Sequence, residues 1–353
     1  MASMKYQNVF VEAFGYEVAP VVVSSAELEE RLAPVYDKLH LSVGQLEALT
    51  GIVERRWWEE GYRVSDGAVV AAERALEAAD FPAKEVEAVV YGGVCREYFE
   101  PATACRVASK LGVSPGAVVH DLSNACLGMI DGMTDVANRI ELGQIRAGLV
   151  VACETAREIN DVMIERMIET PTMEFYKHSL ATLTGGSGAA AVLMTDGSRS
   201  RSKRRRLLGG EVRSAARHHD LCRWGVEELD SSASGRLRPY TTTDSAAVLR
   251  HGVDLGVKTW RAFLKSLGWV ESQVDRVISH QVGGSHRDLI MRSIRVPLEK
   301  DFSTFSYLGN MGTVSLPLTA AIAEDRQVLR PGDRTAFLGI GSGLNCLMLG
   351  LEW

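Results

Sequence analysis

The chain of 353 residues is long enough for one large domain or two of ordinary size, and its 46% hydrophobic content is typical of a globular protein. Its formal net charge of -6 argues against a general nucleic-acid binder, because neutralising phosphates requires a basic surface. The most apolar runs, at 147–153 and 189–194, fall short of the roughly 20 residues that cross a bilayer, so we expect no membrane span. No charged-then-apolar signal sequence opens the chain, which predicts a cytoplasmic protein.

Helical and strand patterns alternate along the chain, which predicts a layered α/β fold. Asp66 is placed to cap an amphipathic helix over 67–79, and an apolar strand over 86–91 follows it. A further strand is expected over 117–122. The next run, 127–142, has the apolar spacing of a buried helix.

The pattern occurs twice, which indicates an internal duplication. Three pairs of segments resemble one another: 85–90 and 273–278, 148–151 and 335–338, and Gly186-Ser187-Gly188 and Gly341-Ser342-Gly343. We therefore predict two βαβ-rich halves, at 1–197 and 208–353, joined by a basic linker or loop at 198–207. The basic run from Ser198 to Arg206 could bind CoA phosphates, an acidic carrier protein or nucleic acid, but a solvated loop is the favoured interpretation.

The six cysteines, at 95, 105, 126, 153, 222 and 346, show no spacing typical of a zinc site or a small disulfide scaffold. Reduced thiols are therefore expected. His218, His219 and Cys222 lie close together in sequence but lack a fourth ligand, so we predict a surface turn and no metal site.

Cys126 lies between the strand over 117–122 and the helix over 127–142, at or near a helix N-terminus. Unpaired N–H groups and the positive end of the helix dipole would lower the pKa of its thiol there and favour a nucleophilic thiolate. Taken alone, Cys126 could equally be a buried structural cysteine.

His280 follows a second-half strand over 277–279, where doubly wound sheets place functional groups. Asn310 lies between Gly309 and Gly312 and offers a neutral donor that complements the imidazole. The pair could hold the carbonyl oxygen of a second substrate. The alternative is a structural histidine and an ordinary glycine turn.

The segment 339–345 resembles a dinucleotide fingerprint only superficially, because no βαβ unit or acidic ribose partner follows it, and we expect no cofactor. The backbone N–H of Ser342 or Gly343 could instead join that of Cys126 around the oxygen of an acyl thioester. A tight bend between strands is the structural alternative.

Glu100 is flanked by an aromatic residue and a proline. Most such residues are solvated loop charges. In an apolar acyl channel, however, this carboxylate would be a competent acceptor of a proton from a carbon acid.

Together these stretches resemble the thiolase superfamily, in its 3-oxoacyl-ACP synthase III-like branch, and most of all the OleA-type acyl-CoA condensing thiolases of bacterial olefin biosynthesis. The resemblance runs from Thr50-Gly51-Ile52 to Leu344-Asn345-Cys346 and so covers nearly the whole chain. It implies a thiolase fold of two duplicated halves in αβαβα layers. The expected activity is the non-decarboxylative Claisen condensation of two fatty acyl-CoA molecules to a 2-alkyl-3-oxo acid or β-ketoacyl thioester.

By position, the resemblance implies that Cys126 is acylated, that His280 and Asn310 hold the second thioester, and that Ser342 supplies an oxyanion N–H. It implies a homodimer in which Glu100 crosses the interface to abstract the α-proton. Pathway enzymes or an acyl carrier protein are further candidate partners.

Two alternatives remain open. A decarboxylating 3-oxoacyl-ACP synthase III would use a malonyl thioester, but it needs no base such as Glu100, since loss of carbon dioxide creates the carbanion. A non-catalytic acyl-binding subunit would need no nucleophile at position 126. The segment after His280 reads Val282-Gly283-Gly284 where carrier-protein-dependent synthases usually have Ala-Asn, which weakens the carrier-protein interpretation.

Overall fold

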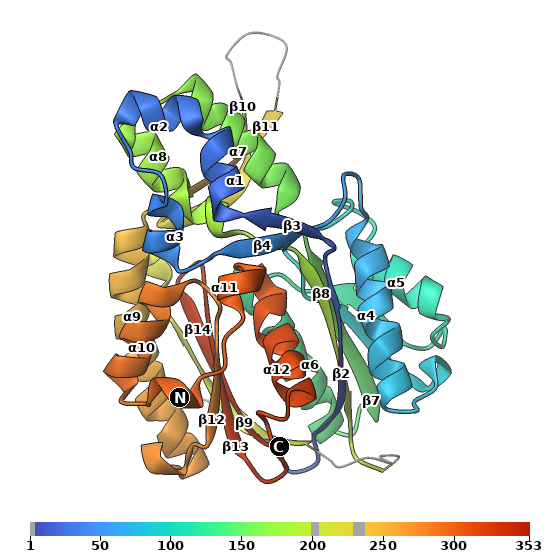
Figure 1. The fold of residues 1–353 in the computed structure, drawn as a ribbon. Coiled ribbons are helices and arrows are strands. Elements are labelled where there is room, and N and C mark those ends of the chain that lie inside the picture. The colour runs from blue at the N-terminus through green and yellow to red at the C-terminus, as the bar shows by residue number, and fades with distance from the viewer. Residues whose placement is uncertain (1–3, 199–204, 229–236) are drawn as a thin grey trace.

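The computed structural model describes residues 4–198, 205–228 and 237–353. Its main feature is a mixed sheet with the strand order β12-β13-β14-β9-β2-β8-β7-β5-β6, and β1 pairs with β9 (Figure 1). These strands are β1 (Met4–Lys5), β2 (Phe10–Val18), β5 (Ala88–Tyr91), β6 (Val118–Asp121), β7 (Ala147–Glu154), β8 (Gly188–Thr195), β9 (Arg205–Ser214), β12 (Arg276–Ser279), β13 (Arg334–Gly341) and β14 (Asn345–Glu352).

The predicted duplication is visible in the pairing of the strands. In the first half β5 runs parallel to β7, which pairs antiparallel with β8, and β8 pairs antiparallel with β2. In the second half β12 runs parallel to β13, which pairs antiparallel with β14, and β14 pairs antiparallel with β9. β6 extends the first half alone. Short pairing between β2 and β9 joins the two halves into one sheet.

Helices cover the two half-sheets so that five layers result (Figure 1). α4 (Val64–Ala78) and α5 (Thr103–Leu111) lie outside the first half, and α9 (Ser245–Leu267) and α10 (Gly284–Ile294) lie outside the second. α6 (Gly128–Glu141) and α12 (Ser315–Asp325) lie between the halves. The αβαβα arrangement expected for a thiolase fold is therefore confirmed.

The largest hydrophobic core lies between the two halves. Its members come from both half-sheets and both central helices, for example Ile130, Met133, Leu318, Phe337 and Leu349. All five side chains are at most 1% exposed. Because both faces of each half-sheet are covered, β7 and β8 are buried at every position, which explains why their sequences are continuous apolar runs.

A cap made of segments from different parts of the chain lies above the carboxyl ends of β7 and β12 (Figure 1). It contains a small β3 (Val21–Ser24) and β4 (Glu54–Trp57) ladder, a β10 (Cys222–Glu228) and β11 (Leu237–Thr243) hairpin, and the helices α1 (Ser25–Arg31), α2 (Ala33–Leu39), α3 (Gln45–Thr50), α7 (Arg157–Glu169) and α8 (Met173–Ser179). Ion pairs fix the hairpin to α7: Arg166 pairs with Glu227, and Arg238 pairs with Glu169 at 2.7 Å.

One local expectation is wrong. Asp66 does not cap the helix that follows it, because α4 begins at Val64 and its N-cap is Arg63. Asp66 lies in the first turn of α4 and pairs with Arg106 at 2.7 Å. A carboxylate is favourable both at the cap and in the first turn, so sequence alone does not separate the two positions.

Most of the predicted basic linker lies outside the described residues, which resume at Arg205. The Arg205 guanidinium pairs with Glu324 and lies over the Trp353 ring at 5.2 Å. The division at 197 and 208 remains a prediction, since β9 pairs with strands of both halves. No helix of the described ranges has the length and apolarity needed to span a bilayer.

Candidate active site

A cavity of about 730 Å³ lies beneath the cap. Cys126, His280 and Asn310 all line it, although they are up to 184 positions apart in the chain (310 minus 126). Ser342 lines it too. The structure therefore brings together four of the residues that the sequence singled out.

Cys126 is presented on a tight turn after β6. Ala125 has a left-handed backbone with φ of 46°, an unfavourable conformation for a non-glycine residue, and Ala125–Leu127 form a short 3-10 turn that leads into α6. A Cβ at Gly128 would lie only 1.9 Å from the Gly92 carbonyl oxygen, so the first turn of α6 needs glycine there. The thiol is thereby fixed at the start of α6.

The glycine-rich turn after β13 packs against the Cys126 turn. A Cβ at Gly341 would lie 3.4 Å from the Cys126 backbone nitrogen, and Asn345 Nδ2 donates to Asn124 Oδ1 at 2.9 Å. Ser342 faces the cavity, as an oxyanion donor must. Gly343 is not among the residues that line the cavity, so its predicted role has no geometric support.

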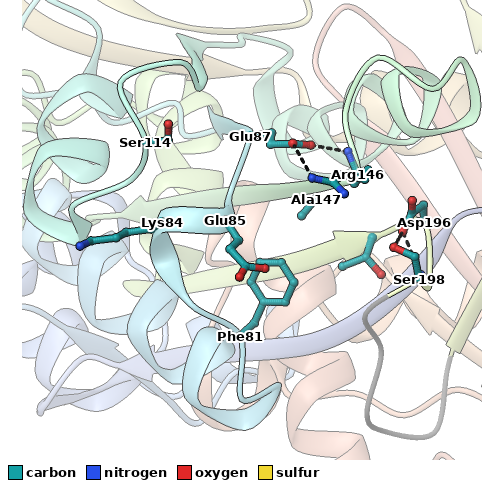
Figure 2. Close-up of a pocket in the computed structure, with 10 residues that line it drawn as sticks. Phe81, Lys84, Glu85, Glu87, Ser114, Arg146, Ala147, Asp196 and Ser198 are labelled. Carbon is teal, nitrogen blue, oxygen red and sulfur yellow. Dashed lines mark hydrogen bonds and ion pairs between the residues drawn. The ribbon is translucent and has the colours of Figure 1, made fainter.

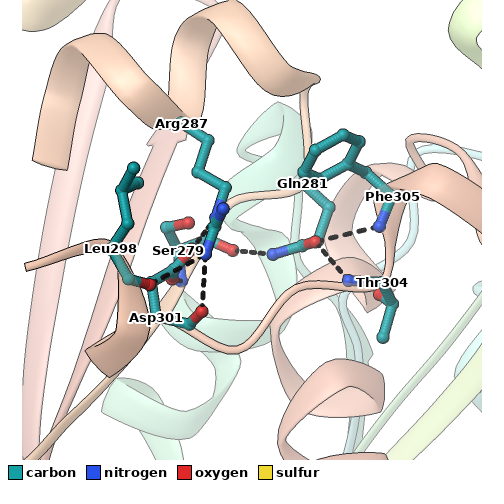
Figure 3. A network of polar contacts seen from close by, with 7 residues as sticks. All are labelled: Ser279, Gln281, Arg287, Leu298, Asp301, Thr304 and Phe305. Carbon is teal, nitrogen blue, oxygen red and sulfur yellow. Dashed lines mark hydrogen bonds and ion pairs between the residues drawn. The ribbon is translucent and has the colours of Figure 1, made fainter. Parts of the chain in front are cut away.

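His280 follows β12, and a buried ion pair fixes the preceding residue (Figure 3). Asp301 Oδ1 accepts from the Ser279 N–H at 3.1 Å, while Asp301 Oδ2 accepts from Arg287 Nε at 2.6 Å. The Asp301 side chain is 0% exposed, so its charge depends on these donors.

Gln281, the residue after His280, forms three hydrogen bonds through its carboxamide (Figure 3). Its Nε2 donates to the Ser279 carbonyl oxygen at 2.6 Å, and its Oε1 accepts from the N–H groups of Thr304 and Phe305 at 2.8 and 3.1 Å. Phe305 begins α11 (Phe305–Leu308), the element just before Asn310. Gln281 therefore connects the segments that carry His280 and Asn310.

Asn310 is oriented by its own backbone and by the next turn. Its N–H donates to the Thr184 carbonyl oxygen at 2.8 Å, and its carbonyl oxygen accepts from the Gly186 N–H at 2.9 Å. The Gly312 N–H donates to Asn310 Oδ1 at 3.1 Å. With Oδ1 engaged, the Nδ2 group of Asn310 is the end left to donate to a ligand.

Burial shifts the pKa values of both Cys126 and His280, and for Cys126 the shift is opposite to the one expected from the sequence. Burial, with smaller contributions from Cys222 and Glu154, raises the pKa of Cys126 to about 12, so the predicted lowering is wrong. Burial, with a contribution from His286, lowers the pKa of His280 to about 4. The Cys126 thiol and the His280 imidazole are therefore both neutral near neutral pH. His280 Nδ1 has no hydrogen-bond partner among the described residues.

Glu100 does not line the cavity of its own chain and is exposed. It follows Tyr98 and Phe99, which are 56% and 104% exposed. Two aromatic side chains left in solvent beside Glu100 are typical of a surface that a partner covers. This placement is compatible with a carboxylate that acts in another subunit.

Two functional candidates escaped the sequence analysis. Glu154 ends β7, lines the cavity and is 4% exposed; its carboxylate accepts from the N–H groups of Val94 at 2.8 Å and Cys95 at 3.1 Å. Burial raises its pKa. Asn160 is 0% exposed and lines the cavity, and its Oδ1 has no partner among the described residues. The sequence contained one sign of a functional role for Glu154, a carboxylate at the end of an apolar strand. It contained no comparable sign for Asn160.

A second cavity, of about 220 Å³, lies at the opposite end of the sheet, where β7 begins and β8 ends (Figure 2). Its charges largely offset one another: the Arg146 guanidinium lies 3.7 Å from Glu87, and Glu85 and Asp196 face the same space as Lys84. It contains no cysteine or histidine.

Within the described ranges, no group of three or more His, Cys, Asp or Glu side chains is arranged to hold a metal ion.

Comparison with known proteins agrees with this geometry. Residues 264–353 match the family model of the C-terminal part of 3-oxoacyl-[acyl-carrier-protein] synthase III. The chain is 54% identical to an acyl-CoA:acyl-CoA alkyltransferase of Shewanella oneidensis, over 99% of this chain and 100% of that protein. It is 35% identical to a protein of the same name from Xanthomonas campestris pv. campestris, over 99% and 100%.

Solved structures give the same result. The crystal structure of a cysteine-to-alanine variant of Xanthomonas campestris OleA matches with a TM-score of 0.92 and 35% identity, covering 99% of this chain and 98% of that one. A cysteine-to-serine variant with bound lauric acid and lauroyl-CoA matches with a TM-score of 0.91. This chain therefore belongs to the acyl-CoA:acyl-CoA alkyltransferase, or OleA-type, family of condensing enzymes in the synthase III-like branch of the thiolase superfamily.

Proposed function

We propose that this protein is an acyltransferase that joins two fatty acyl-CoA molecules by a non-decarboxylative Claisen condensation. The product is a 2-alkyl-3-oxo acid, or the β-ketoacyl thioester that precedes it, and CoA. The observation that carries this proposal is the convergence of Cys126, His280 and Asn310 on one cavity. The family relationship sets the substrate class.

The first step forms the acyl-enzyme. The Cys126 sulfur attacks the thioester carbonyl carbon while neutral His280 takes the thiol proton, and the carbon–sulfur bond to CoA then breaks as that proton passes to the CoA thiolate. The N–H groups of Cys126 and Ser342 are the donors that stabilise the oxyanion. Burial raises the pKa of the Cys126 thiol to about 12, so the thiol needs a base at this step, and His280 is a neutral imidazole that lines the same cavity.

The second step forms the carbon–carbon bond. His280 and Asn310 Nδ2 donate to the carbonyl oxygen of a second acyl-CoA, which stabilises its enolate, and Glu100 of the partner subunit removes the α-proton. The carbanion attacks the carbonyl carbon of the Cys126 thioester, the carbon–sulfur bond to Cys126 breaks, and the proton that Glu100 removed returns to the Cys126 thiolate. The two-acyl product is a β-ketoacyl-CoA, and hydrolysis of its thioester gives the acid and CoA.

A homodimer is part of this proposal, because Glu100 lies outside the cavity of its own chain. Exposed Tyr98 and Phe99 support a partner surface at this loop. A cytoplasmic location is part of the proposal, and the family relationship supports a role in olefin biosynthesis with pathway enzymes as partners.

A decarboxylating synthase III is the second candidate, favoured by the family match over residues 264–353. A relative named β-ketoacyl-[acyl-carrier-protein] synthase III 5, from Streptomyces coelicolor, is 29% identical over 87% of this chain, well below the 54% of the alkyltransferase. Faster turnover of a malonyl thioester than of a second acyl-CoA would favour this candidate.

Two variants test the proposal by intact-mass measurement and product analysis with acyl-CoA. Cys126→Ser should form no thioester adduct, whereas Cys105→Ser, which removes an exposed thiol, should acylate normally. Glu100→Gln should acquire the acyl group on Cys126 but form condensed product at least about a hundredfold more slowly, the range of a lost general base. Normal condensation by Glu100→Gln would refute the base assignment, and a wild-type protein that binds acyl-CoA without an adduct would be a non-catalytic acyl-binding subunit.

A further inference from the structure

The turn that presents Cys126 has a backbone conformation that its own residues do not favour. Ala125 has a left-handed φ of 46°. Asn124 before it, with φ of -151° and ψ of 54°, lies outside both the helical and the extended regions. Residues in such sparsely populated conformations persist only where the surrounding structure fixes them. Groups outside the turn must therefore hold it in place.

The Asn124 carboxamide is bonded at both ends. Its Nδ2 donates to Asp131 Oδ2, in the first turn of α6, and its Oδ1 accepts from Asn345 Nδ2 at 2.9 Å, at the start of β14. Burial raises the pKa of Asp131, and the bond from Asn124 opposes that shift. Because a carboxylate only accepts hydrogen bonds, both carboxamides in this line must point their Nδ2 groups toward Asp131. The three side chains thus form one directed line of hydrogen bonds from the sheet to α6.

Asn345 also supports the turn that carries Ser342. β14 is paired on both sides, with β13 and β9, and the first residue pair of β13 and β14 beside the turn is Gly341 with Asn345. Ser342 lies in the three-residue turn between them. A Cβ at Gly343 would lie 2.8 Å from Asn345 Nδ2, so this turn packs on the Asn345 side chain. Asn345 therefore contacts the Ser342 turn on one side and the turn of the nucleophile on the other.

The three side chains lie behind the wall of the cavity. Asn124, Asp131 and Asn345 do not line it, although the residues on either side of Asn124 and of Asn345 do. A ligand in the cavity would therefore not touch them. What they fix is the wall itself, on which the N–H groups of Cys126 and Ser342 are carried.

We infer that Asn124 and Asn345 are positioning residues for acylation, which hold the N–H groups of Cys126 and Ser342 aimed at one oxyanion. Two donors on separate turns stabilise the same oxygen only if the turns keep a fixed relation, and donors fixed beforehand need no reorganisation during the reaction. The bond from Asn345 to Asn124 joins the two turns directly, and Asp131 anchors it to α6. This inference rests on the proposed acyl-enzyme and adds the residues that align its oxyanion donors.

The test follows acylation of Cys126 by lauroyl-CoA in single-turnover experiments, with intact-mass measurement at a series of lauroyl-CoA concentrations. Asn345→Asp replaces a donor by an acceptor of the same shape, so one end of the Asn124 amide meets a group of like polarity whichever way it turns. The maximal acylation rate should fall at least about tenfold, toward the roughly hundredfold effect of a lost oxyanion donor. The concentration that gives half the maximal rate should change less than about twofold, because the oxyanion exists only in the transition state.

A second substitution distinguishes misaligned donors from a damaged fold. Asp131→Asn alone should acylate at nearly the wild-type rate, because an amide oxygen can still accept from Asn124. Combined with Asn345→Asp, it supplies a donor at position 131 and an acceptor at position 345. The Asn124 amide can then turn over and bond at both ends again, so the double variant should recover to within about threefold of the wild-type rate.

Asn138→Asp is the matched control on α6. Asn138 is exposed, and its Oδ1 accepts from the Tyr6 hydroxyl at 2.9 Å, which a carboxylate also does, so the acylation rate should not change. If Asn345→Asp does not fold, Asn345→Ala removes the donor without adding a charge and should show the same fall in rate.

A wild-type maximal rate in the Asn345 variants would overturn the inference, as would a double variant that is as slow as Asn345→Asp alone. A higher half-saturating concentration with an unchanged maximal rate would also overturn it, since that result indicates a role in substrate binding. Absence of any adduct on the wild-type protein would instead reject the proposed function, and this inference with it.

Discussion

Two opposing effects act on the pKa of the Cys126 thiol. The N-terminus of α6 stabilises a thiolate, but removal of the sulfur from water, together with Cys222 and the Glu154 carboxylate, raises the pKa of the thiol to about 12. Burial is the largest of the effects on this pKa. A neutral thiol reacts slowly with electrophiles, and for this reason the proposed mechanism assigns a base, His280, to the acylation step.

At the residue scale we predict that Glu154→Gln makes Cys126 more reactive. Loss of the nearby negative charge lowers the pKa of the thiol, so alkylation by iodoacetamide at about pH 8 should accelerate by up to about tenfold, the effect of one pKa unit. Peptide mass spectrometry quantifies the Cys126 adduct. In both proteins the rate should rise about tenfold for each pH unit below the pKa of the thiol.

Glu158→Gln is the matched control, because Glu158 is exposed and its carboxylate accepts from the Thr155 hydroxyl at 2.6 Å. Its alkylation rate should equal that of the wild type. A slower Glu154→Gln would show that Glu154 supports the thiolate by holding the Val94 and Cys95 N–H groups, and the electrostatic argument would fail.

At the element scale, the site depends on the hydrogen bonds that join the end of β12 to the start of α11. His280 and Asn310 lie on segments that do not pair as strands, and the buried Gln281 carboxamide spans the gap with three hydrogen bonds. Three backbone groups, on Ser279, Thr304 and Phe305, thereby obtain partners in a region with almost no access to water.

Gln281→Leu should therefore lower the free energy of unfolding by about 3 kcal/mol, since each buried backbone group left unpaired costs about 1–3 kcal/mol and the structure relaxes in part. Urea denaturation followed by circular dichroism measures the loss. Gln273→Leu removes an exposed glutamine that accepts one backbone N–H, from Val270 at 3.0 Å, and should cost less than about 1 kcal/mol. Equal losses in the two variants would contradict the bridging role of Gln281.

At the scale of the whole molecule, the proposed mechanism requires a second chain, because the proposed base Glu100 does not line the cavity of its own chain. Cys126, His280 and Asn310 face the cavity, but Glu100 lies in solvent beside two exposed aromatic residues. In the proposed twofold dimer the same surface meets its own copy, so each subunit would give its Glu100 to the other and receive one in return.

Mixed dimers test this exchange. Cys126→Ser and Glu100→Gln subunits are each expected to be inactive as homodimers. When the two variants are refolded or expressed together, a mixed dimer contains one complete site, so activity should return to about a quarter of the wild-type value if subunits pair at random. Failure of the mixture to recover activity, with dimers present by size-exclusion chromatography, would show that Glu100 acts in its own subunit. Activity of the Glu100→Gln homodimer would place Glu100 outside the reaction.

The sequence alone predicted the parts of this protein that depend on local pattern. Apolar runs and helical spacing indicated β7, α6 and the second-half strands, and repetition of the pattern indicated the duplicated fold. Cys126, His280 and Asn310 were recognisable because each follows a strand or lies in a glycine turn, and the ends of strands in a layered α/β fold converge. The exact start of α4 was missed because Asp66 suits the cap and the first turn equally well.

The tertiary structure decided what depends on neighbours distant in the chain. The pKa of Cys126 follows from burial and from Cys222 and Glu154, which lie 96 and 28 positions away (222 minus 126 and 154 minus 126). Desolvation and cavity shape are sums over all atoms that surround a point, and folding assembles those atoms from every part of the chain, so no local pattern contains them.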